Sequence, residues 1–164
     1  MNGFLAVVVI VGLIAAWWLI PKMIGKGINA ADRKLIRPNS YAKAQETVRS
    51  ELTLTSGIAP ADLLSKVVSD VGAATARPAT VAQVYLKQRT SEGAVFAFGS
   101  GFVGDLFIAA VELSASGGGS RGVFHVLAWK ESGADVKGLT TMRELRDKVQ
   151  QSVLAAGGAV DVIA

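Results

Sequence analysis

Residues 50–72, Ser-Glu-Leu-Thr-Leu-Thr-Ser-Gly-Ile-Ala-Pro-Ala-Asp-Leu-Leu-Ser-Lys-Val-Val-Ser-Asp-Val-Gly, change from one hydrophobic period to another. In the first part Leu52 and Leu54 alternate with polar neighbours, which predicts a half-buried strand. In the second part Pro60 suits a first helical turn, apolar residues follow at helical spacing, and Gly72 is a natural stop. A strand that leads directly into an amphipathic helix favours an α+β domain.

The rest of the chain after this unit continues the same pattern. Alternating or apolar runs predict further strands, a Gly/Ser-rich stretch predicts a flexible loop, and the pair Thr141 and Glu144 predicts the capped start of a closing helix. We therefore expect the order β-α-β-β-β-β-α, a small antiparallel sheet with two packed helices. The expected ranges are strands at 81–90, 94–98 and 123–130, a loop at 114–122, a helix at 141–156, and a short edge strand at 160–163. Residues 106–113 are apolar throughout, and their periodicity does not distinguish strand from helix.

The order of these elements resembles the helix-grip arrangement of the START/Bet v1-like superfamily. The resemblance rests on the strand before Gly-Ile-Ala-Pro-Ala-Asp-Leu-Leu at 57–64, the meander that follows, and the long closing helix. It covers roughly residues 50–156 by order of elements alone, and this chain is a strand or two shorter than that family. The resemblance implies an apolar ligand cavity between the sheet and the closing helix, lined by Leu145, Val149 and Val153.

Residues 3–20 form an apolar stretch without a charge, followed by Pro21 and Lys22. About 20 such residues cross the hydrocarbon core of a bilayer as one helix, and Trp17 and Trp18 near its end suit the headgroup layer. A secretory signal peptide is the alternative. It requires a positive start and a small-residue cleavage site, whereas this stretch begins Met-Asn and ends Trp-Trp-Leu-Ile-Pro. We expect residues 1–22 to be a transmembrane helix.

The net charge of +4 is unevenly distributed. Residues 21–50 hold seven basic and two acidic residues, 7 − 2 = +5, which leaves 4 − 5 = −1 for residues 51–164. The basic pI of about 9.6 thus belongs to a juxtamembrane connector at 23–49 and not to the domain at 50–164. Basic residues on one flank place that flank in the cytoplasm, with the amino terminus outside, and they attract anionic lipid headgroups. The flanking residues are Lys22, Lys26, Arg33, Lys34 and Arg37.

Several motifs match catalytic or cofactor sites only in part. Residues 99–104, Gly-Ser-Gly-Phe-Val-Gly, match the dinucleotide fingerprint, which requires a helix directly afterwards, at 106–113. Residues 118–122 match Gly-x-Ser-x-Gly but lack the strand before and the helix after. The chain has no cysteine and only His125, too few ligands for a zinc site, and its carboxylates show no pairing in spacing. Lys87 and Arg89 beside Tyr85 are the one faint indication of nucleic-acid binding.

These observations predict a single-pass, membrane-tethered, non-enzymatic binding or scaffold domain on the cytoplasmic face of the cell membrane. No catalytic residue, metal or cofactor is expected, and nucleic acid is not an expected partner. The expected partners are anionic lipid headgroups and an unidentified protein or apolar ligand. Two alternatives remain open: a helix-grip carrier of lipid or another hydrophobic ligand, and an enzyme that uses a nucleotide through Gly99, Gly101 and Gly104.

Overall fold

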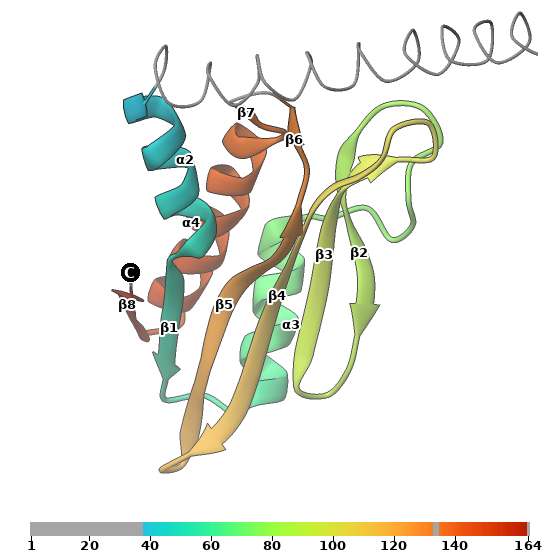
Figure 1. Cartoon of the computed structure of the whole chain (residues 1–164). Coiled ribbons are helices and arrows are strands. Elements are labelled where there is room, and N and C mark those ends of the chain that lie inside the picture. The colour runs from blue at the N-terminus through green and yellow to red at the C-terminus, as the bar shows by residue number, and fades with distance from the viewer. Residues whose placement is uncertain (1–37, 133–134, 164) are drawn as a thin grey trace, which may run out of the picture.

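Six antiparallel strands form one twisted sheet in the computed structural model, which describes residues 38–132 and 135–163 (Figure 1). The order across the sheet is β2-β3-β4-β5-β1-β8, so β1 is inserted between β5 and the last strand of the chain. A separate two-stranded hairpin follows β5. The strands are β1 (Glu51–Ser56), β2 (Gln83–Arg89), β3 (Gly93–Ser100), β4 (Gly104–Ser116), β5 (Gly119–Trp129), β6 (Glu131–Ser132), β7 (Asp135–Val136) and β8 (Ala159–Ile163).

In the part of the chain that the structure describes, three helices accompany the sheet, and the predicted α+β class is confirmed. Figure 1 shows α3 (Pro60–Val71) and α4 (Leu139–Ala155) side by side against one face of the sheet. The third helix, α2 (Pro38–Arg49), precedes β1 and packs against β5 and β7. Its sequence has no wide apolar stripe, and the prediction contained only two helices. Ala44 and Val48 are its described core residues.

The two ends of α3 form as the sequence predicts. Pro60 occupies the start of the helix, and Gly72 ends it in the left-handed conformation at φ 64°, which a residue without Cβ adopts at little cost. The start of α4 differs from the prediction. Gly138, at φ 76°, precedes Leu139, so Thr141 lies inside the first turn and does not cap the helix. A side chain at Gly138 would also collide with the ring of Phe98, at 2.8 Å.

The core lies between α3, α4 and one face of the sheet. Phe96, Phe107 and Phe124 from neighbouring strands are almost completely buried there, together with Leu52 and Leu54 of β1. This confirms the alternation from which β1 was predicted. Along each strand, the side chains that alternate with these core residues point to the opposite face of the sheet. No helix of the described ranges covers that face.

Two segments differ from their expected form. Residues 106–113, left open by the sequence, belong to β4. The expected loop at 114–122 is instead the end of a tight hairpin, in which only Gly117 and Gly118 turn, at φ 57° and 87°. Two consecutive positive φ values match the twist of hairpin strands, so glycines here favour strand pairing over flexibility.

The expected membrane segment lies outside the described residues. None of the helices within 38–132 and 135–163 is long and apolar enough to cross a membrane. Residues 3–20 and the connector up to Arg37 are not among these residues.

Three β-bulges interrupt the register of the sheet. The pairing skips Lys87 in β2, Leu106 in β4 and Leu127 in β5. Each extra residue reverses the alternation of side chains beyond it and bends the strand. The bulges therefore decide which side chains of β2 and β4 reach the helix-free face.

We predict that Gly122→Ala destabilises the domain by about 2 kcal/mol or more. A Cβ at this position would lie 2.0 Å from the Glu112 carbonyl oxygen and 2.6 Å from Leu113 Cδ2, so β4 and β5 would have to separate. Gly57→Ala is the control, because nothing lies within 4 Å of its Cβ position. The measurement is the free energy of unfolding in detergent, and equal values for the two variants would contradict the prediction.

Candidate functional site

A concavity of about 770 Å³ lies on the helix-free face, across β3, β4 and β5. Val95 of β3 and Val123 of β5 contribute apolar surface to it, on either side of Ala110 of β4, which is almost completely buried. Gln88 and Arg121 are among its polar lining residues. An apolar centre within a polar border is the usual anatomy of a protein interface.

His125 belongs to the same face and has a polar neighbour. It pairs with Ala110 across β4 and β5, and its Nε2 lies 3.9 Å from Oε1 of Glu112, which also lines the concavity. The single histidine thus lies beside the concavity. No group of three or more metal-binding side chains occurs within residues 38–132 and 135–163.

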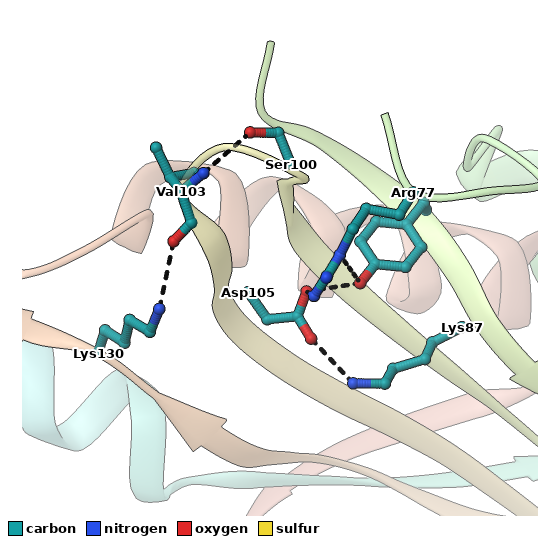
Figure 2. Close-up of polar contacts among 7 residues, drawn as sticks. Arg77, Lys87, Ser100, Val103, Asp105 and Lys130 are labelled. Carbon is teal, nitrogen blue, oxygen red and sulfur yellow. Dashed lines mark hydrogen bonds and ion pairs between the residues drawn. The ribbon is translucent and has the colours of Figure 1, made fainter. Parts of the chain in front are cut away.

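A compact polar cluster occupies the same face, where β2, β3 and β4 meet the loop before β2. Three side chains converge on the carboxylate of Asp105 (Figure 2). The Tyr85 hydroxyl donates to Oδ1 at 2.5 Å, Lys87 Nζ donates to Oδ2 at 2.8 Å, and the Arg77 guanidinium donates to Oδ1. Arg77 Nε also donates to the Tyr85 hydroxyl at 3.1 Å, and its guanidinium lies 5.8 Å from the centre of the tyrosine ring.

The geometry of the cluster follows from the bulges. Skipping Leu106 places Asp105 opposite Gly99, on the face that Tyr85 occupies. Gly99 leaves room for this approach, because a Cβ there would lie 2.1 Å from the Gly104 carbonyl oxygen. Ala74 forms a parallel bridge with Tyr85 along the outer edge of β2, and the chain then brings Arg77 over the sheet.

The cluster keeps the carboxylate of Asp105 ionised at neutral pH. Burial disfavours the charged form of Asp105, but the hydrogen bonds from Lys87, Tyr85 and Arg77 outweigh burial and hold its pKa well below the usual range. Burial and the hydrogen bond to Asp105 both raise the pKa of Tyr85, and the same carboxylate raises the pKa of Arg77. The three hydrogen bonds to Asp105 fix the loop to the sheet, and the lowered pKa makes this carboxylate a poor general acid or base.

The three residues predicted to line a ligand cavity lie in the packed core. Leu145, Val149 and Val153 are almost completely buried, in one cluster with Leu52 and Leu54. Leu145 also borders a cleft of about 350 Å³ between the end of α3, β2 and α4. Val149 and Val153 line neither this cleft nor the concavity on the helix-free face. The helix-grip ligand therefore stays a prediction.

The glycine motifs occupy turns and strand ends. Residues 101–103 form the turn between β3 and β4, and β4 follows directly, so the helix that a dinucleotide site needs is absent at 106–113. Gly119 and Gly122 of the second motif lie in β5. Residues 99–104 therefore lack the helix start that would face a pyrophosphate.

The basic residues beside Tyr85 do not form one stripe. Lys87 binds Asp105 on the helix-free face, whereas Arg89 donates to the Ser65 hydroxyl on α3 at 2.8 Å. The membrane-anchor residues, from Trp17 to Arg37, lie outside the described ranges.

We predict that Asp105→Asn removes a pH-dependent part of the stability. The folded-state pKa lies below the usual value of 3.8, so the stabilisation is present above about pH 4 and is lost as the pH falls further. Hydrogen bonds to a charged group suggest about 1.5–3 kcal/mol at pH 7. The measurement is the unfolding midpoint between pH 7 and pH 2, with Tyr85→Phe, which removes one of the three donors, showing a smaller loss. Parallel pH profiles for wild type and Asp105→Asn would contradict this role.

Comparison of the chain with protein-family models, curated proteins and solved structures found no match.

Proposed function

We propose that the protein is a single-pass membrane protein whose cytoplasmic domain binds a protein partner through its helix-free sheet face. The observation that carries the proposal is the apolar surface on that face. Val95 and Val123 are partly exposed in the concavity, and no helix of the described residues covers them. In an antiparallel sheet with one solvated face, polar residues normally occupy these positions.

The shape of the concavity favours a protein partner over a small apolar ligand. A small-molecule site normally encloses most of its ligand, between domains or between a sheet and its helices. This concavity lies on an uncovered sheet face, and polar residues from β2, β4 and β5 border it. Such a surface suits a segment of a folded or extended chain, with the apolar centre desolvated and the polar border paired.

The polar cluster supports binding rather than catalysis. Asp105 is the carboxylate with the most strongly lowered pKa in the described residues, and Arg77, Tyr85 and Lys87 satisfy it fully. A catalytic carboxylate is poised to exchange a proton near the working pH, whereas this one remains charged. Its role is to hold the loop at one end of the face in a fixed position.

The membrane tether is supported by the sequence. The uncharged stretch at 3–20 has the length of a bilayer-spanning helix, and its basic flank leads directly into the domain. A tether of this kind keeps the domain at the membrane surface, where it meets a partner at raised effective concentration.

A photo-crosslinking amino acid at Val123 is expected to capture one discrete protein in membranes from intact cells. Val123 is half-buried within the concavity, so a partner bound there lies within reach of the probe. The matched control is the same probe at Asp62, which is exposed on α3 away from this face. Equal products from both positions, or none from Val123, would show that the groove is not the binding surface.

The topology is testable with single cysteines, because the chain has none of its own. We expect Asn2→Cys to react with a membrane-impermeant maleimide on intact cells, since the basic flank keeps the other side in the cytoplasm. Ser116→Cys, at the exposed end of β4, is expected to react only after permeabilisation. Labelling of Ser116→Cys on intact cells would reverse the orientation.

A further inference from the structure

The turn between β3 and β4 presents an apolar tip to solvent. Phe102 is 87% exposed and Val103 is 44% exposed, and Val81 on the adjacent loop is 66% exposed. An exposed phenylalanine beside two exposed valines has a hydrophobic cost in water that burial elsewhere would relieve. We call these three residues the apolar tip.

The backbone of the apolar tip is already hydrogen-bonded within the domain. Gly101 N–H donates to the Pro78 carbonyl at 2.7 Å, and Phe102 N–H donates to the Ala79 carbonyl at 3.2 Å. These two bonds join the turn to the neighbouring loop, which the Arg77–Asp105 contact also fixes to the sheet.

Two side chains satisfy the remaining polar groups at Val103. Figure 2 shows its N–H directed at the Ser100 hydroxyl, at 3.4 Å, and its carbonyl directed at Lys130 Nζ, at 3.3 Å. Peptide groups with internal partners enter a low-dielectric layer at much lower cost than free ones. The N–H groups of residues 101–103 and the Val103 carbonyl can therefore leave water while they keep their hydrogen bonds.

The apolar tip lies at the end of the sheet where the chain enters the domain. Gln45 of α2 donates to Glu131, directly after Lys130, and Lys130 in turn reaches Val103. Figure 1 shows the start of α2 and the β3–β4 turn at the same, upper end of the sheet. The stretch of about 17 residues from Pro21 to Arg37, before α2, thus joins the expected membrane helix to the end of the domain that carries the apolar tip.

The length of the connector keeps that end near the bilayer. Even fully extended, about 17 residues span no more than about 60 Å, and a flexible coil of this length averages roughly 20–25 Å. The tip is thus presented to the headgroup layer at high effective concentration.

The charges around the tip permit contact with anionic lipid. Lys130 and Lys137 are exposed on adjacent segments, where Glu131 and Asp135 balance them, and the cluster of Arg77, Lys87 and Asp105 adds a net +1. Residues 21–37 carry five basic residues against Asp32. Aromatic rings with nearby basic residues favour the boundary between headgroups and acyl chains.

We infer that the apolar tip inserts Phe102 and Val103 into the headgroup layer of the bilayer that holds the anchor, giving the domain a second, fixed contact with the membrane. This inference rests on the proposed tether. The occupant of the tip is anionic lipid. In this orientation the strands stand on the membrane by the β3–β4 turn, and the groove faces sideways, open to a partner in the cytoplasm.

The test uses the full chain reconstituted in vesicles of phosphatidylcholine mixed with phosphatidylglycerol. A nitroxide at Val103→Cys is expected to collide with dissolved oxygen more than with an aqueous nickel chelate, as a label among lipids does. A nitroxide at Ser116→Cys, at the opposite end of β4, is expected to collide mainly with the nickel chelate. Adding Phe102→Ser to the first variant is expected to lower the ratio of docked to undocked domain roughly tenfold. Leu154→Ser is the matched control, an exposed apolar residue in the last turn of α4, and is expected to change nothing.

Two results would overturn the inference while leaving the tether intact. In both, the chain resists carbonate extraction. In the first, the label at position 103 is as accessible to the nickel chelate as the label at 116. In the second, it is shielded from both reagents even in pure phosphatidylcholine, which indicates a protein contact. Extraction of the chain by carbonate would refute the tether and the docking together.

Discussion

Burial of one face of the sheet beneath α3 and α4 is the interaction on which the rest of the domain depends. Phe96, Phe107 and Phe124 are removed from water there, and each such side chain contributes about 1.5–3 kcal/mol before the cost of ordering is counted. Both helices are committed to this face, and α2 packs toward the end of β5. On the other face, the loop before β2 covers only part of the sheet. The one-sided core therefore leaves the rest of that face accessible to a binding partner.

The sequence predicts the elements that have one buried face and misses those that do not. β1 and α3 are found because alternation or helical spacing marks a single apolar side, with Pro60 and Gly72 at the helix ends. β4 is ambiguous because its apolar residues lie on both faces, and this removes the alternation that identifies a strand. α2 has only Ala44 and Val48 as described core residues, too narrow a stripe to recognise. At α4 the capping pair is present in sequence, but Gly138 and the ring of Phe98 fix the start earlier.

The sequence does not predict that the side chains of the polar cluster converge on Asp105, and the reason is geometric. Asp105 is 28 residues from Arg77, 20 from Tyr85 and 18 from Lys87 along the chain. Regular alternation would place it on the same face as Phe107, in the core. Only the skipped Leu106 turns it outward, and no residue type marks such a skip in advance. Gly99, which leaves space for the close approach of β4, is the one local sign of this arrangement. The same glycine also matches the dinucleotide fingerprint at 99–104, so its sequence context alone does not identify its role.

The position of β8 has a consequence for the integrity of the sheet. Its five residues cover the outer edge of β1, and the bridge at Ala74 covers part of the outer edge of β2. Proteolytic trimming of residues 159–163 would expose the unpaired backbone groups of β1, a template for pairing with another chain. In the intact sheet the outermost strand is β8 itself, and it carries Asp161 at its centre. A charge there disfavours stacking of a further strand, so the last strand serves as a guard against edge-to-edge aggregation.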